Sequence, residues 1–391
     1  MIYLDNAATT PVLSDVRKAM EPYLTDGFGN PSSTHAMGQA AREAVEDARR
    51  RIAAALSCYP DEIIFTSGGT ESDNLAILGA VAASPRRSIV TTGIEHPAVL
   101  NACAFLERMG YSVTYVGVNH RGILNMDELQ TAVNDDTALV AVMAVNNEVG
   151  SIQPITEAAT IAKAHGSLFF TDAVQAVGRI PLQFSSSPID LLSLSGHKLG
   201  APKGIAALLV RRGTPLSPLL HGGGQERGLR SGTENVPAIV GLAAAVEHAV
   251  KVIAAGQIAR EQTTMIQALL DAAREIPFTH VYHTPHTTAP GILNLCFDYL
   301  NGADLVSLLS AKGICVSTSS ACASGTGAPS HVLMAMGLSP DTARGALRIS
   351  LGYHNTPDEI QTLCRILPQC VGMLRKQNPI YKKRKENQNH E

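Results

Sequence analysis

The sequence has 391 residues, which is more than one hydrophobic core usually serves, so we expect two domains. Hydrophobic residues make up 45% of the chain and charged residues 17%, a balance typical of folded globular proteins and unlike that of disordered ones. The formal net charge of −3 gives no electrostatic reason to expect nucleic acid or an anionic membrane as the main partner.

In chain order, two amphipathic helices are expected first, over 10–24 and 32–56. Short apolar strands then alternate with helices, the helices being expected over 70–83, 96–110, 125–133 and 154–166. The strands are expected over 62–68, 88–93, 111–116, 137–145, 167–173, 190–195 and 204–212. This pattern predicts an α/β protein with a mostly parallel, seven-stranded sheet covered by helices. In such sheets the chemistry lies at the carboxyl ends of the strands.

The pattern changes near residue 255, where strands and helices of a smaller α+β domain follow. We expect a large domain over 13–255 and a small domain built from 1–12 and 256–375. The charged tail, 376–391, lacks apolar spacing and is expected to be disordered.

Targeting and redox features of the sequence are sparse. The apolar stretch 237–256 is interrupted by Glu247, His248 and Lys251, which favours an amphipathic helix over a membrane span. The N-terminus shows no export signal. Seven cysteines without CxxC pairs argue against a disulfide framework and against a metal site, so we expect a cytoplasmic protein without a bound metal.

A phosphate seat is indicated where the first strand runs into Gly68 and Gly69 and a helix begins near Thr70. Backbone N–H groups at a helix N-terminus, together with a threonine hydroxyl, are suited to bind phosphate. No lysine follows the glycines, so the pattern is not a Walker A motif. Glycine turns before helices are common, and the pattern alone leaves an ordinary turn open.

Two polar residues follow apolar strands further along the chain. Asp172 is either a helix cap or the partner of a buried cation. Lys198 follows the end of the strand 190–195, and a desolvated lysine there has a lowered pKa and becomes a nucleophile that forms Schiff bases. The nearby Lys203 lies in a glycine loop and is expected to be structural or solvent-exposed.

The phosphate seat at Thr70, the carboxylate of Asp172 and the strand-end Lys198 together are typical of a site for pyridoxal phosphate (PLP). The lysine would hold the cofactor, the carboxylate would keep the pyridine nitrogen protonated, and the phosphate would anchor the ring. His96 also begins a helix after a strand. Alone it is an ordinary polar residue, but beside a PLP ring it can stack on the face and carry protons.

Eight motifs in this order resemble those of cysteine desulfurases of the NifS/IscS type, in the class V branch of fold-type I PLP enzymes. They read YLDNAATTP, FTSGGTESDN, EHPAVL, VNNEVG, TDAVQAVG, SLSGHKLGAPKG, HGGGQERGLRSGT and SSACASG. The resemblance covers about residues 1 to 365, and the ordered set is far more specific than any single motif.

The resemblance implies roles for residues around the cofactor. Lys198 matches the lysine that carries PLP, Asp172 the partner of the pyridine nitrogen, Gln175 the partner of the ring hydroxyl and His96 the stacking histidine. The phosphate-binding set is matched by Gly69, Thr70, Ser195 and His197.

The resemblance also implies a shared site and a substrate clamp. Thr233 matches a threonine that reaches the phosphate of the partner subunit's cofactor, which implies a homodimer. Asn147 and Arg348 match groups near the cofactor and the substrate carboxylate, and the arginine fork suits a carboxylate.

Cys322 stands apart from the other cysteines because its surroundings, STSSACASGTGAPS, are small, polar and rich in glycine. We expect a mobile loop over about 317–330. The other six cysteines lie in or beside apolar segments and are expected to behave as small hydrophobes. The resemblance implies that Cys322, as thiolate, takes sulfur from L-cysteine, leaving L-alanine and a persulfide.

The sequence departs from its relatives in the glycine content of this loop and in lacking the apolar C-terminal segment that some relatives use to dock iron–sulfur scaffold proteins. The sequence therefore leaves open whether the persulfide sulfur passes to iron–sulfur cluster assembly or to another sulfur acceptor. A selenocysteine lyase or another class V aminotransferase-like enzyme remains an alternative, as does a non-catalytic sulfur carrier or scaffold protein.

Overall fold

The structure is a computed structural model, and it describes residues 1–318 and 328–388. Its central element is a seven-stranded sheet with the strand order β2-β8-β7-β6-β5-β3-β4. Only β8 is antiparallel to its neighbours β2 and β7, so the predicted mostly parallel sheet is confirmed. The strands are β2 (Ile63–Thr66), β3 (Ser88–Thr92), β4 (Ser112–Val116), β5 (Thr137–Ala141), β6 (Leu168–Asp172), β7 (Leu191–Ser195) and β8 (Ala206–Val210).

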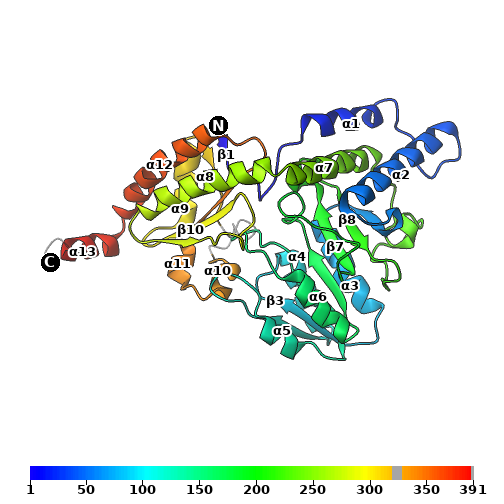
Figure 1. The fold of residues 1–391 in the computed structure, drawn as a ribbon, viewed down its shortest axis with the longest axis horizontal. Helices are drawn as coiled ribbons and strands as arrows, with labels where there is room; N and C mark the ends of the chain where they lie inside the picture. The colour runs from blue at the N-terminus through cyan, green and yellow to red at the C-terminus, as the bar shows by residue number, and fades with distance from the viewer. Residues whose placement is uncertain (319–327, 389–391) are drawn as a thin grey trace.

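Helices cover both faces of this sheet (Figure 1). The side chains alternate between the faces: Ile63 and Phe65 belong to one core cluster, and Ile64 between them belongs to another. The first cluster includes residues of α2 (Ala36–Leu56), α6 (Ile155–Ala164) and α7 (Val236–Ala255), and the second those of α3 (Gly69–Ala82) and α4 (Pro97–Arg108). Helices α1 (Ser14–Leu24) and α5 (Met126–Ala132) complete this part of the fold.

Helix α7 is long and apolar enough to cross a membrane by length and composition, and half of its apolar window is buried inside the protein. It packs against α1 and α2. Core helices of soluble proteins pass the same test, so the feature is weak support for a membrane span.

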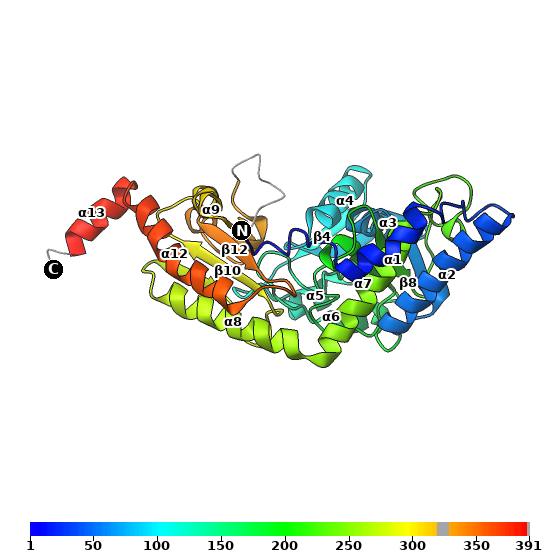
Figure 2. The ribbon, with the colours of Figure 1, turned by 90° about the horizontal axis from the view of Figure 1, so that it is seen from above.

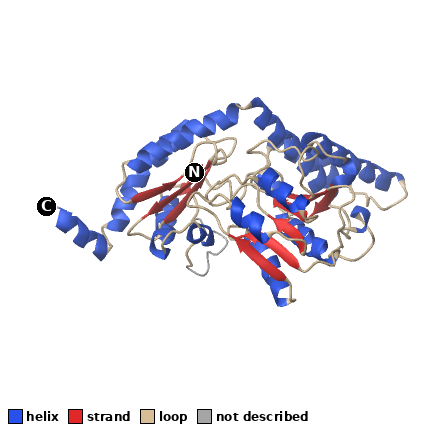
Figure 3. Cartoon of the chain, turned by 60° about the horizontal axis from the view of Figure 1, so that its bottom comes forward, coloured by secondary structure: helices blue, strands red, loops and turns tan. Residues whose placement is uncertain are grey.

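A second sheet has three antiparallel strands in the order β12-β10-β9: β9 (Thr279–Tyr282), β10 (Ile292–Phe297) and β12 (Ala346–Ser350). Figure 3 shows it apart from the larger sheet. Its core includes residues of α8 (Gln257–Arg274), α9 (Gly302–Ala311) and α12 (Pro357–Arg375). The short helices α10 (His331–Ala335) and α11 (Pro340–Arg344) lie between α9 and β12 in the chain.

The N-terminal strand β1 (Ile2–Tyr3) pairs with β11 (Ile314–Cys315), and Leu4 belongs to the core of the second sheet. At the other sequence boundary, α7 ends at Ala255 and Gly256 takes a left-handed φ of 67° before α8 begins. Figure 2 shows α7 and α8 following one another along one side of the molecule. The domain limits at residues 12 and 255 stay a prediction.

The charged tail differs from the sequence-based expectation of disorder, because Pro379–Gln388 form helix α13. Asn378 provides the physical reason, since its side-chain oxygen accepts hydrogen bonds from the backbone N–H groups of Ile380 and Tyr381. The ring of Tyr381 also packs edge-on against Phe278. These local contacts are not visible in the tail's composition.

Candidate active site

A cavity of about 400 Å³ lies at the carboxyl ends of β6 and β7, where the sequence predicts the chemistry. Its volume is within the range of small-molecule sites. Nine of the predicted residues line it, and they come from segments far apart in the sequence: Gly69, Thr70, His96, Asn147, Asp172, Gln175, Ser195, His197 and Lys198. Arg348 lines it as well. The structure therefore brings together ten of the twelve predicted site residues.

Lys198 ends a short 3-10 helix, Gly196–Lys198, directly after β7. Its Nζ donates hydrogen bonds of 2.6 Å to the carbonyl oxygens of both Ala7 and Ala8. The N-terminal segment is held there because the backbone N–H of Thr10 donates to the His197 carbonyl at 2.8 Å. The lysine amine thus lies where the first residues of the chain cross the end of the large sheet.

Asp172 is the last residue of β6 and is 5% exposed. One of its carboxylate oxygens accepts a hydrogen bond of 2.9 Å from the backbone N–H of Val174. Burial raises the pKa of Asp172, while the nearby His96 and Lys198 act in the opposite direction. A buried carboxylate beside the Lys198 amine and the His96 ring is suited to hold a proton on a ring nitrogen, so Asp172 does more than cap a helix.

His96 precedes α4, and its Nδ1 accepts a hydrogen bond of 3.2 Å from the backbone N–H of Ala98. Burial lowers the pKa of His96, against the attraction of Asp172. A neutral imidazole that accepts at Nδ1 carries its proton on Nε2. His96 is therefore both the helix cap and a lining residue of the cavity.

The phosphate end of the cavity is formed at the start of α3. A Cβ atom at Gly69 would lie 3.1 Å from Val174 Cγ2 and 3.6 Å from Ser195 Cβ, so the backbone approaches closely where glycine stands. Free N–H groups of the first helical turn, with Thr70 and Ser195 beside them, form an anion seat. Burial, with Lys198 and Lys203 as further causes, lowers the pKa of His197 to about 4, so this imidazole is neutral.

Arg348 lies in β12 of the second sheet and is 2% exposed. Its Nη2 donates to Asp5 Oδ1 at 2.9 Å, and its Nη1 donates to the Asn147 carbonyl at 3.0 Å. The Nε of Arg348 is buried and has no hydrogen-bond partner in the described structure. This guanidinium retains donors for a carboxylate that enters the cavity.

Four residues from the sequence analysis have different outcomes. Gln175 lines the cavity and donates to the Ala7 carbonyl at 2.8 Å. Thr233 is exposed and is not among the residues that line the cavity, and its reach toward a partner subunit stays a prediction. Cys322 lies outside the described residues. Lys203 is exposed, as expected.

Sequence reasoning missed two buried acids beside the site. Asp73 lines the cavity and accepts a hydrogen bond of 2.6 Å from Ser193, and burial together with Asp172 raises its pKa well above the usual range. Glu95, next to His96, is fully buried, and burial raises its pKa to about 8. The available signal was the position of Asp73 one helical turn after Thr70, on the same face of α3.

Pyridoxal phosphate fits this set of residues. A buried carboxylate, a lysine amine and an N-terminal helix turn with a close backbone approach all line one cavity. They would bind the ring nitrogen, the aldehyde carbon and the phosphate, respectively.

Comparisons with known proteins agree with this chemistry. Residues 2–363 match the family described as Aminotransferase class-V. The cysteine desulfurase IscS of Methanosarcina thermophila is 46% identical over 384 residues, covering 97% of this chain and 94% of that protein. The cysteine desulfurase NifS of Azotobacter vinelandii is 43% identical over 387 residues, covering 97% and 95%.

Solved structures give the same result. A structure described as a NifS-like protein matches with a TM-score of 0.90 at 39% identity, over 95% of this chain and 99% of that one. The structure described as SspA in complex with cysteine matches with a TM-score of 0.79 at 37% identity, over 91% and 100%. The predicted family and its PLP-enzyme fold are confirmed. The chain belongs to the class-V aminotransferase family and, within it, to the PLP-dependent cysteine desulfurases of the NifS/IscS type.

Proposed function

We propose that this protein converts L-cysteine to L-alanine and keeps the sulfur as a persulfide on Cys322. In this reaction the C–S bond of the substrate breaks and an S–S bond to Cys322 forms. The thiol protons of the substrate and of Cys322 balance the hydrogen that the alanine methyl group gains and the hydrogen that the persulfide carries. Cα regains its proton, so no external oxidant or reductant is needed. The cavity that joins Lys198, Asp172, His96 and Arg348 is the observation that carries the proposal.

Arg348 orients the substrate through its carboxylate. The guanidinium is fixed from two sides, by Asp5 and by the Asn147 carbonyl, and it comes from the second sheet. Its position relative to Lys198 therefore depends on how the two sheets are held together. The N-terminal segment contributes to this, because Asp5 contacts Arg348 and Ala7 contacts Lys198.

Lys198 carries the cofactor and moves a proton at its Nζ. When bound, PLP accepts the electron pair that remains on the substrate Cα after its proton leaves. Released Lys198 can take that Cα proton, and the Ala7 and Ala8 carbonyls provide acceptors for the resulting ammonium. Asp172 keeps a proton on the ring nitrogen through its buried carboxylate.

The described residues that flank Cys322 support its role. The backbone of Ser317 exchanges hydrogen bonds of 2.7 and 3.2 Å with Arg348. On the other side, Ser330 donates to the Glu148 carboxylate, and His331 Nε2 lies 2.9 Å from the Glu95 carbonyl oxygen. These contacts hold the described residues on both sides of this segment near Arg348 and near Glu95, the residue before His96.

Other cysteines are poorly suited to accept the sulfur. None of the cysteines in the described part of the chain lines the cavity. Burial raises the pKa of Cys58 and Cys103 to about 12 and also raises that of Cys296. Thiols of this kind stay protonated, and the thiolate is the nucleophile.

Further parts of the proposal concern the assembly and the destination of the sulfur. We propose a homodimer in which Thr233 reaches the partner's cofactor, in a cytoplasmic setting. The exposed position of Thr233, outside the cavity of its own chain, supports this role. The persulfide is passed to iron–sulfur cluster assembly or to another sulfur acceptor.

Mass spectrometry after incubation with L-cysteine tests the proposal. The mass of one sulfur atom should be added and should map to Cys322, and Cys322→Ala should abolish both this adduct and alanine formation. Cys315→Ala, on the neighbouring strand β11, is the matched control and should retain both. Alanine formation that survives Cys322→Ala would contradict the proposal. If Cys322→Ala loses cysteine turnover but retains selenocysteine turnover, the Cys322 thiol is needed specifically for sulfur abstraction.

A further inference from the structure

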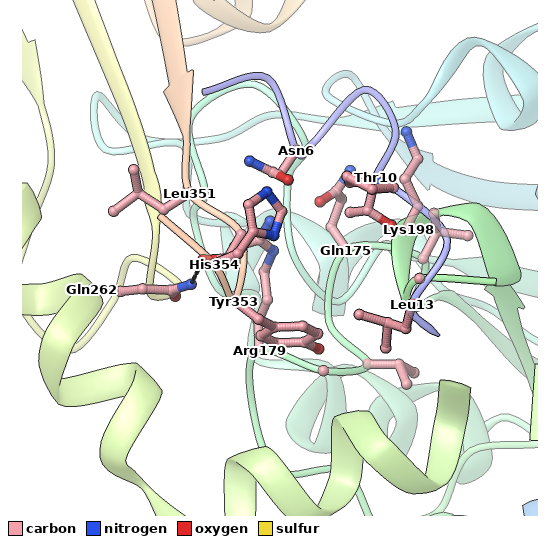
Figure 4. A pocket seen from close by; sticks show the side chains of 16 residues that line it. Asn6, Thr10, Leu13, Gln175, Arg179, Lys198, Gln262, Leu351, Tyr353 and His354 are labelled. Carbon is pink, nitrogen blue, oxygen red and sulfur yellow. Dashed lines mark hydrogen bonds between the residues drawn. The ribbon is translucent and has the colours of Figure 1, made fainter. Parts of the chain in front are cut away.

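A second cavity lies beside the active site and shares part of its wall. Val174, Gln175 and Lys198 line both cavities. Figure 4 shows Lys198 and Gln175 on one side of the second cavity and Arg179, Tyr353 and Gln262 on the other. Its volume is about 50 Å³, which leaves room for roughly three water molecules and excludes a second amino acid or a phosphate ester.

The charge of this cavity wall is unbalanced. Two cationic side chains, Arg179 and Lys198, line it, and no aspartate or glutamate does so. Arg179 forms no ion pair with any carboxylate in the described residues, and the segment 319–327 contains no acidic residue. Arg348, whose charge acts on Arg179, has Asp5 as its own partner.

Arg179 keeps donors available toward this space. Its Nη1 donates to the Pro290 carbonyl at 2.9 Å, and this is its one hydrogen bond within the described structure. Burial lowers the pKa of Arg179 to about 10, so the guanidinium is still charged at neutral pH. Arg179 is half-buried, and removing a charge from water without a counter-charge is costly, a cost that a bound anion lowers.

Tyr353 adds a neutral donor to the same wall. Burial raises the pKa of its phenol, so the hydroxyl stays protonated. The ring is fixed against His248, with centroids 5.3 Å apart, and the hydroxyl lies 2.8 Å from the position that a Cβ of Gly178 would occupy. This oxygen has no hydrogen-bond partner in the described part of the chain, and it can donate to an anion.

We propose that this cavity binds one small monovalent anion of the size of chloride, held by Arg179 and Tyr353. Because Lys198 lines the same cavity, the anion favours the protonated form of the lysine amine. The anion would thereby influence the proton step assigned to Lys198. This last consequence rests on the proposed function, whereas the anion site itself does not.

Anomalous diffraction tests the site directly. Crystals of the PLP-loaded protein grown in sodium bromide should show a bromide peak within hydrogen-bond distance of the Arg179 guanidinium. The peak should be absent from Arg179→Gln. A wild-type cavity without bromide, or an equal peak in Arg179→Gln, overturns the proposal. Neither outcome depends on desulfurase activity, so the failure of the proposed function would be distinguishable.

Thermal unfolding in solution keeps the proposal testable if the variant does not crystallise. At constant ionic strength, replacing gluconate by chloride should raise the unfolding midpoint of the wild-type holoenzyme. Arg179→Gln should lose this rise. Arg179→Lys, which retains the charge, should keep it, and so should the exposed control Arg50→Gln. An equal chloride effect in Arg179→Gln and in the wild type would count against the site.

The influence on Lys198 has a spectroscopic readout. The pH at which the absorbance of the bound cofactor changes should be higher in chloride than in gluconate, and this difference should vanish in Arg179→Gln. If bromide binds at Arg179 while the pH midpoint stays unchanged, the site stands and its coupling to Lys198 is wrong.

Discussion

Replacing Arg348 by lysine should weaken the binding of L-cysteine while leaving the chemical step nearly unchanged. Arginine has five N–H donors in a fixed fork. In this structure one donates to Asp5 and one to the Asn147 carbonyl, and the buried Nε is without a partner. Lysine keeps the charge but offers three donors from a single atom, so it cannot hold both anchors and also bind a carboxylate through two parallel hydrogen bonds.

The magnitude follows from the lost contact. One hydrogen bond to a charged group contributes about 1.5–3 kcal/mol. At about 1.4 kcal/mol per factor of ten, KM should rise by about 10- to 150-fold. Because Arg348 contacts the carboxylate and not the bonds that break, kcat should change far less.

Steady-state alanine formation at varied L-cysteine concentration measures this split between KM and kcat. Arg344→Lys is the matched control, since Arg344 is an exposed arginine in the preceding helix and pairs with Asp341 on the surface. It should behave as wild type. A KM for Arg348→Lys within about twofold of wild type would refute the assignment of Arg348 to the substrate carboxylate.

Three other predictions concern buried charges. Glu226→Gln removes the buried one of the two carboxylates that pair with Arg49, 2.7 Å away, and should lower the unfolding free energy by about 3–5 kcal/mol. Glu46→Gln removes the half-exposed carboxylate on the same arginine and should cost less than about 1 kcal/mol. Equal losses in the two variants would contradict the burial argument. Asp172→Asn should lower kcat/KM for cysteine by about 100-fold or more, and retained activity would exclude the role given to this carboxylate. Burial raises the pKa of Glu148 to about 7 from the usual 4.5, so the folded state binds more protons than the unfolded state between these pH values. The unfolding free energy of the wild type should therefore fall by on the order of 3 kcal/mol as the pH rises through that interval. Glu148→Gln should lack this fall, and parallel pH profiles of the two proteins would refute the prediction.

The sequence indicates the strand-end residues of the site well, because parallel strands end at the same edge of a sheet. Asp172 and Lys198 follow apolar strands, and Gly69 stands where a strand meets a helix. Each position is a local feature of the pattern. The structure confirms that these three residues line one cavity.

The remaining contacts depend on tertiary packing that periodicity does not encode. The Ala7 and Ala8 carbonyls meet Lys198 across about 190 residues of sequence, and alanine side chains give no sign of it. Asp73 is buried because Ser193 satisfies it, and the pair is visible only once α3 lies on β7. The helix after residue 378 was likewise missed, because its cap and its aromatic contact lie outside the composition argument.

The attachment of the cofactor to Lys198 is the claim on which the mechanism rests. Borohydride reduction of the PLP-loaded protein, followed by peptide mapping, should recover the cofactor on the peptide that contains Lys198, with the exposed Lys203 unmodified. Recovery on another lysine, or on none, would contradict the account.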